Sequence, residues 1–167
     1  PDTLLNIKNI PGLDNINEVG GTLKIGALAT LANIAENQTI QSKYTALAEA
    51  ASRVGAPEIR NMGTIGGNIC QRVRCWYYRH EFNRFYCLRK GGKVCYAWDS
   101  QKGDNRYHSM FGKLNGCLAV NPGDIAPVLV AFGATIMYES PSGIKSETAD
   151  KFFTVKGEKT TILNDDE

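Results

Sequence analysis

Four cysteines in the middle of the chain constrain its folding more than any other feature of the sequence. Cys75, Cys87, Cys95 and Cys117 are separated by 11, 7 and 21 residues. The chain contains five cysteines, and this odd number disfavours a disulfide framework in which every cysteine is paired. The pattern predicts four metal ligands and one spare thiol, Cys70, which directly follows Asn68 and Ile69 and is expected to point into the core.

The spacing of the four cysteines favours an iron–sulfur cluster over a zinc ion. Zinc sites usually contain a pair of ligands with about two to four intervening residues, and no such pair occurs among these four cysteines. Wide spacing suits a [4Fe–4S] cluster whose ligands come from separate loops, and cations near such a cluster offset its negative charge. Residues 72–93 contain seven arginines and lysines against one acid, Glu81. Zinc and unligated core thiols remain alternatives.

The same segment is also rich in aromatic residues. Residues 76–98 contain eight of the fifteen aromatic side chains of the chain. A mixture of basic and aromatic residues is also typical of nucleic-acid binding, but the net charge of only +2 and the interleaved cysteines disfavour that function. Residues 71–116 are therefore interpreted as an insertion with a separate function within the domain.

The flanking sequence predicts a soluble α+β domain with a mostly antiparallel sheet and a few helices. Its length of 167 residues, with 43% hydrophobic and 22% charged residues, suits one core or two small subdomains. Apolar periodicity and turn residues predict the following elements: strands at 4–10 and 159–163, hairpins at 16–25 and 135–148, and helices at 30–36, 42–54 and 122–132.

A glycine-rich turn at 63–68 precedes the cysteines. It does not match the G-x-G-x-x-G fingerprint, and a helix comes before it rather than after it. Adjacent Gly66 and Gly67 can let backbone N–H groups approach a pyrophosphate, with Thr64 and Asn68 adding hydrogen bonds. By itself the turn is better explained as structural. Asp124 is likewise explained by structure alone, because an acid in the first turn of a helix interacts favourably with the helix dipole.

Three segments together resemble the flavoprotein subunit of the molybdenum hydroxylases, the family of xanthine dehydrogenase and aldehyde oxidoreductase. They are LKIGALATL at 23–31, RNMGTIGGNI at 60–69 and VNPGDIAPVLVAFGA at 120–134. The resemblance implies that Thr64, Ile65, Gly66, Gly67 and Asn68 bind the FAD pyrophosphate. It also implies that Asp124 contacts the flavin nucleotide.

The cysteine-rich segment is similar to the branch of this family with an extra [4Fe–4S] cluster, as in 4-hydroxybenzoyl-CoA reductase and bacterial aldehyde oxidoreductases. The resemblance implies that Cys75, Cys87, Cys95 and Cys117 are the cluster ligands and that Cys70 does not bind iron. It further implies a molybdopterin subunit, a [2Fe–2S] subunit and an external carrier such as a ferredoxin. No acid–base catalytic residue, nucleic acid or membrane is expected.

The resemblance implies the middle subdomain of a longer FAD-binding domain. The chain begins with Pro1, and the family's earlier Ala-Gly-Gly-Thr-Asp-like turn, which contacts the other side of FAD, is not found. No signal peptide is visible, so a cytoplasmic location, or export after folding with partner subunits, is expected. The rival interpretation is a zinc-stabilised structural or binding module without redox activity.

Overall fold

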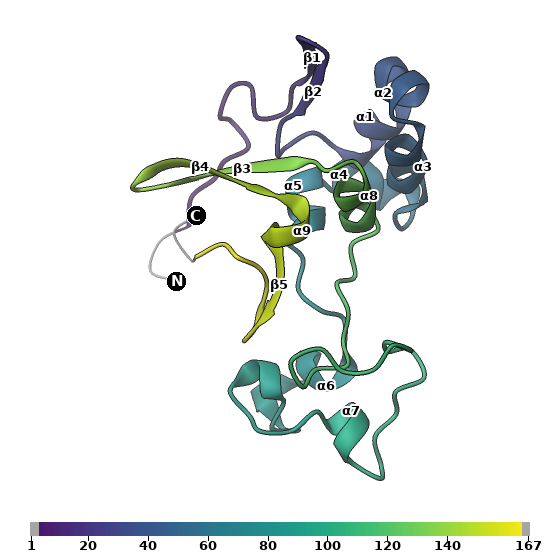
Figure 1. Ribbon diagram of the computed structural model, residues 1–167, viewed down its shortest axis with the longest axis vertical. Coiled ribbons are helices and arrows are strands. Elements are labelled where there is room, and N and C mark those ends of the chain that lie inside the picture. Colours follow the sequence, from purple (N-terminus) through teal and green to yellow (C-terminus); the bar gives the residue numbers. More distant parts are fainter. Residues whose placement is uncertain (1–3, 165–167) are drawn as a thin grey trace. The chain divides into compact units, whose positions relative to one another are not determined.

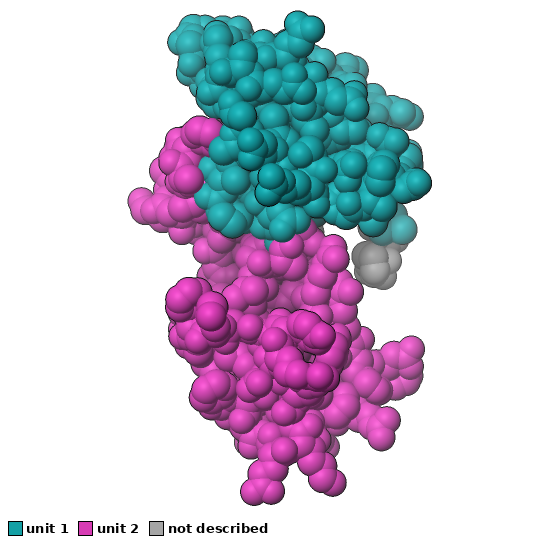
Figure 2. All heavy atoms as spheres, turned by 90° about the vertical axis from the view of Figure 1, so that its right-hand side faces the viewer, with its two compact units in different colours: residues 1–70, 123–129 teal, residues 71–122, 130–167 magenta. Residues whose placement is uncertain are grey.

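The protein consists of two compact units that alternate along the chain. The computed structural model describes residues 4–164. Unit 1 comprises residues 1–70 and 123–129, and unit 2 comprises residues 71–122 and 130–167 (Figure 2). Within residues 4–164, every helix is too short or too polar to cross a membrane.

Unit 1 begins with a β-hairpin. Strands β1 (Ile16–Val19) and β2 (Thr22–Ile25) pair in antiparallel fashion, with Val19 opposite Thr22. Gly20 and Gly21 form the two-residue turn with φ angles of 59° and 76°, a conformation that glycine adopts without steric cost. The predicted hairpin at 16–25 is confirmed.

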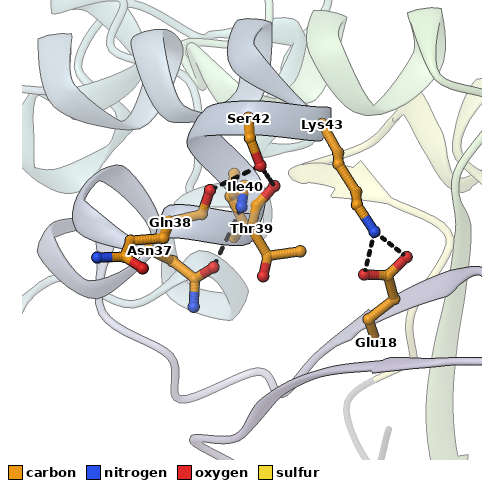
Figure 3. A network of polar contacts seen from close by, with 7 residues as sticks. All are labelled: Glu18, Asn37, Gln38, Thr39, Ile40, Ser42 and Lys43. Carbon is orange, nitrogen blue, oxygen red and sulfur yellow. Dashed lines mark hydrogen bonds and ion pairs between the residues drawn. The ribbon is translucent and has the colours of Figure 1, made fainter.

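Short helices follow the hairpin in unit 1 (Figure 1). They are α1 (Leu31–Glu36), α2 (Gln38–Lys43), α3 (Thr45–Arg53), α4 (Pro57–Met62) and α5 (Ile65–Ile69). The helix predicted at 42–54 is divided, because Tyr44 leaves the helical region at φ −130° and ψ 44°. The side chain of Asn37 accepts a hydrogen bond from the N–H of Ile40 and so starts α2 (Figure 3).

Buried aliphatic side chains hold these helices together. Leu31, Ile34, Ile40 and Ala51 are at most 2% exposed. The surface of the same unit carries an ion pair of 2.7 Å between Lys43 of α2 and Glu18 of β1 (Figure 3). Apolar burial is therefore the main stabilising interaction in unit 1, because exposed ion pairs contribute little to stability.

The carboxyl-terminal part of unit 2 contains two hairpins joined by a helical turn. Strands β3 (Thr135–Ser140) and β4 (Gly143–Thr148) form the first, as predicted. Strands β5 (Phe153–Lys156) and β6 (Lys159–Thr161) form the second, with a bulge, and α9 (Ala149–Phe152) lies between the hairpins. Phe152 is 1% exposed and anchors this region.

Residues 71–122 of unit 2 form loops punctuated by single helical turns. These are α6 (Trp76–Arg79), the 3-10 turns η1 (Glu81–Asn83) and η2 (Leu88–Lys90), and α7 (Tyr96–Asp99). Non-glycine residues with positive φ angles also occur here: Phe82, Asn83, Tyr86 and Asn115. The Asn83 side chain accepts a hydrogen bond of 2.8 Å from the N–H of Cys87, which stabilises one such turn.

Two expectations are wrong. Residues 4–10 form no strand but irregular backbone and a turn, in which the N–H of Ile10 donates to Ile7 O. Leu4 and Leu5 are 87% and 80% exposed, so this segment has neither a partner strand nor a buried face. Instead of one sheet, residues 4–164 contain three separate two-stranded sheets, because each strand pairs only with its neighbour in sequence.

The last predicted helix, α8 (Ile125–Ala131), begins three residues later than expected.

Candidate functional site

The glycine-rich turn of unit 1 is anchored to the segment that precedes α1. The N–H of Ile65 donates to Ala29 O, and the N–H of Gly66 donates to Ala27 O, both at 2.9 Å. These bonds place the motifs at 23–31 and 60–69 beside each other. The backbone N–H groups of Ile65 and Gly66 are therefore already used in hydrogen bonds within the protein.

Gly66 and Gly67 have different surroundings. A Cβ atom on Gly66 would lie 2.8 Å from Ala27 O, so close packing of backbone requires glycine there. A Cβ atom on Gly67 would meet only Thr64 Oγ1, at 3.3 Å, and Gly67 is exposed. The N–H of Gly67 donates to Thr64 Oγ1 at 3.2 Å, which makes Thr64 the N-cap of α5. Gly67 is thus the exposed glycine of the turn, and its N–H bonds to a side-chain oxygen rather than to the backbone.

The other predicted FAD contacts lie in the same unit. Asn68 is buried, and its N–H donates to Thr64 O at 2.9 Å within α5. Asp124 is exposed and immediately precedes α8. Arg60 is half-buried, and its Nη1 donates to Val54 O at 3.2 Å and to Gly55 O at 2.8 Å, where α3 ends.

In unit 2, the four predicted metal ligands line one small cavity. Cys75, Cys87, Cys95 and Cys117 all contribute to its wall, and its volume is about 10 Å³. That space corresponds to roughly one water molecule. Cys70 does not belong to this cavity and is exposed, so the expectation that it points into the core is wrong. It follows the last residue of α5, where the buried face of that short helix has ended.

Three of the four cysteines occupy the same position relative to a helical turn. Cys75 is the N-cap of α6, Cys87 the N-cap of η2 and Cys95 the N-cap of α7. Cys117 is held differently, by paired backbone hydrogen bonds of 2.8 and 3.0 Å with Leu114. This arrangement is not predictable from the sequence, because cysteine is not among the preferred N-cap residues.

The electrostatics of the cavity favour neutral thiols in the protein without metal. Burial raises the pKa of Cys75, while the backbone N–H groups of Tyr78 and Tyr77 oppose the rise. Burial likewise raises the pKa of Cys87. The nearby sulfur of Cys117 raises both pKa values further. The N–H of Ala119 donates to Cys117 Sγ at 3.4 Å.

Aromatic rings pack around the same cavity. The ring centroids of Tyr77 and Tyr96 are 4.9 Å apart, and Phe85 lies 5.0 and 4.7 Å from these two rings. Tyr77 and Tyr96 also line the cavity. Cys87 and Cys117 are buried beside these rings, whereas Cys75 and Cys95 are only half-buried.

The donor chemistry of the cavity fits a metal group, although its shape is not that of a single-ion site. Four thiols and the buried Arg89 guanidinium line the wall, and thiolates with a nearby cation are the groups that an anionic metal–sulfur centre requires. Among residues 4–164, no three or more His, Cys, Asp or Glu side chains are grouped closely enough to hold one metal ion. The sulfur atoms are therefore gathered without forming a compact tetrahedral site.

Similar proteins were found by sequence and by structure. The chain is 29% identical to the aldehyde oxidoreductase FAD-binding subunit of Escherichia coli over 164 residues, which are 97% of this chain and 50% of that subunit. It is 46% identical to the nicotinate dehydrogenase FAD-subunit of Eubacterium barkeri over 69 residues, or 41% of this chain and 23% of that subunit. The chain thus spans half or less of the length of these relatives.

A solved structure supports the fold. Carbon monoxide dehydrogenase from Hydrogenophaga pseudoflava contains a chain that superposes with a TM-score of 0.58 at 24% identity, covering 95% of this chain and 38% of that chain. The sequence profile of the FAD-binding domain in molybdopterin dehydrogenase matches residues 1–167. The chain therefore belongs to the family of FAD-binding domains of molybdopterin dehydrogenases.

Proposed function

We propose that this chain forms part of an electron-transfer subunit of a molybdopterin-dependent dehydrogenase or hydroxylase and that it binds both FAD and a [4Fe–4S] cluster. Membership of the FAD-binding family and similarity to subunits of aldehyde oxidoreductase and nicotinate dehydrogenase support the flavin part. The observation that carries the cluster part is the single cavity lined by Cys75, Cys87, Cys95 and Cys117.

For FAD, the proposed contacts come from the turn at 64–68 and from Asp124. Thr64 and Gly67 offer a hydroxyl and a backbone N–H to a pyrophosphate oxygen, and the missing side chain of Gly67 lets the phosphate approach. Ile65 and Gly66 anchor the turn through their bonds to residues 27–29. Asn68 completes α5, and Asp124 accepts hydrogen bonds from the nucleotide.

For the cluster, the four cysteines are the proposed ligands and the surrounding loops the proposed shell. Binding requires each thiol to lose its proton, because the thiolate is the metal ligand. The loops at 75–117 must also widen the cavity beyond its present 10 Å³. The match to the E. coli aldehyde oxidoreductase subunit extends over 97% of this chain and so includes the cysteine segment.

In the complete enzyme, we place the molybdopterin and [2Fe–2S] centres on partner subunits. FAD and the cluster, when bound, supply the redox chemistry and pass electrons between the [2Fe–2S] centres and an external carrier such as a ferredoxin. The residues of this chain position the two groups and exclude water from the thiols. In this scheme no residue of the chain needs to act as an acid–base catalyst.

The test is the metal, sulfide and flavin content of the complete subunit, purified anaerobically with its partner chains. We expect iron and acid-labile sulfide in equal amounts, with an absorption that dithionite bleaches, and one FAD. Cys87→Ser should remove the iron but retain the flavin, whereas Cys70→Ser, the matched control, should change neither. Zinc without sulfide would establish the structural alternative, and simultaneous loss of FAD in Cys87→Ser would show that the cysteine segment supports the flavin site.

A further inference from the structure

A buried guanidinium in the wall of the cysteine cavity has unsatisfied hydrogen-bond donors. Arg89, in η2, is only 3% exposed. Its Nη2 donates to Lys159 O, but Nε and Nη1 are buried and have no hydrogen-bond partner among residues 4–164. Arginine is rarely buried unless it is paired, because removing its charge from water is costly.

A histidine in the same wall has the same deficiency. Both ring nitrogens of His108 are buried without a hydrogen-bond partner within the described part of the chain. The ring is held in place by stacking on Tyr77, with centroids 6.5 Å apart and planes 21° from parallel. The N–H of the His108 backbone donates to Asn105 O at 2.9 Å. Even a neutral imidazole carries one N–H group, so a buried acceptor is needed.

Carboxylates near the cavity have other partners. Asp99 pairs with Lys113 at 2.9 Å, and Asp104 pairs with Arg106 at 2.7 Å. No ion pair to Arg89 occurs among residues 4–164. What Arg89 and His108 do share is the cavity, whose wall contains both of them and all four cysteines. The acceptor that both side chains require can therefore come from the occupant of that cavity.

We propose that Arg89 and His108 donate hydrogen bonds to the metal–thiolate group held by the four cysteines and thereby retain it and set its reduction potential. This inference rests on the proposed function. Once the thiols are deprotonated, the sulfur atoms become acceptors, and the Arg89 charge offsets the negative charge of the group. Both contributions favour the more negative, reduced state, so they raise the reduction potential.

The test compares buried and exposed residues of the same type in the complete subunit with its partner chains. Arg89→Gln removes the buried charge, and Arg84→Gln removes an exposed charge from the same segment. His108→Phe keeps an aromatic ring against Tyr77 without its N–H group, and His80→Phe is the exposed counterpart. The measurements are the rate of metal release to a chelator, the midpoint potential from a redox titration followed by electron paramagnetic resonance, and the melting temperature of the metal-free protein.

We expect Arg89→Gln and His108→Phe to release metal about 10- to 100-fold faster than wild type, the range typical of lost outer-shell contacts. Both should lower the midpoint potential, while Arg84→Gln and His80→Phe should behave like wild type. The melting temperature of metal-free Arg89→Gln should not fall, because the change removes an unpaired buried charge.

Three results would overturn the inference, and they differ in what else they overturn. If wild type holds the cluster but the buried and exposed variants have equal release rates and potentials, only the inference fails. If metal-free Arg89→Gln melts lower and metal release is unchanged, the role of Arg89 is purely structural, through Lys159. If the anaerobically purified wild type contains no metal, the inference and the cluster part of the proposed function fail together.

Discussion

The replacement of Gly67 by alanine separates a structural turn from a phosphate-binding one. Gly67 lies inside α5, is exposed and has no positive φ angle. Alanine in such a position is more favourable than glycine by roughly 0.5–1 kcal/mol. The new methyl group would meet only Thr64 Oγ1, at 3.3 Å, and this side chain can shift. We therefore expect FAD-free Gly67→Ala to be as stable as wild type or up to about 1 kcal/mol more stable.

The same methyl group should weaken FAD binding. The N–H of Gly67 bonds to a side-chain oxygen rather than to a backbone carbonyl, so it can be redirected to a phosphate. A hydrogen bond to a charged group contributes about 1.5–3 kcal/mol, and its loss corresponds to a roughly 10- to 150-fold increase in Kd. Affinity and stability should thus change in opposite directions.

The control is Gly66→Ala, one residue earlier. Its Cβ would lie 2.8 Å from Ala27 O, and because that atom belongs to the backbone, the turn must move. We expect a loss of stability of about 1–3 kcal/mol before any effect on FAD. The assays are chemical denaturation of the flavin-free protein and titration with FAD followed by flavin fluorescence. If Gly67→Ala leaves the Kd for FAD unchanged, the turn at 64–68 is structural and the proposed pyrophosphate contact is refuted.

Two further predictions concern stability alone. Phe152→Ala should destabilise unit 2 by about 3–5 kcal/mol, because the ring is only 1% exposed. Urea denaturation should then show a lower midpoint. A loss of stability below about 1 kcal/mol would contradict the role of Phe152 as an anchor. Arg60→Ala should destabilise unit 1 by about 1–3 kcal/mol through loss of its bonds to Val54 O and Gly55 O. Arg60→Lys should recover only part of this loss, since one ammonium group replaces the wider guanidinium, and full recovery would show that charge alone matters.

Local elements of this fold were predictable from sequence because their causes are local. Gly20 and Gly21 determine the first hairpin turn, and Thr30 starts α1 by accepting a hydrogen bond from the N–H of Asn33, both as expected. The division of one predicted helix at Tyr44 was not predictable, because apolar periodicity continues through that residue. The separation of the strands into three sheets depends on which strands meet in space, and periodicity contains no such information.

The candidate sites show the same limit. Sequence grouped the four cysteines that line one cavity, but it placed Cys70 in the core, where the end of α5 leaves it exposed. It also could not distinguish Arg89 from the other cations of residues 72–93, because composition does not reveal burial. The glycine pair of the turn looked equivalent in sequence, yet Gly66 is constrained by Ala27 and Gly67 is not.

The raised thiol pKa values and the buried Arg89 guanidinium have one common explanation. In the metal-free protein, burial keeps Cys75 and Cys87 neutral, so Arg89 has no nearby anion from its own cavity. In the proposed metal-bound form, thiolates replace the thiols and supply that anion, which offsets more of the cost of burying Arg89 than its bond to Lys159 O does alone. The proposed metal binding should therefore be coupled to the stability of residues 71–122. It predicts that metal loading raises the melting temperature of wild type more than that of Arg89→Gln, and equal increases would contradict the coupling.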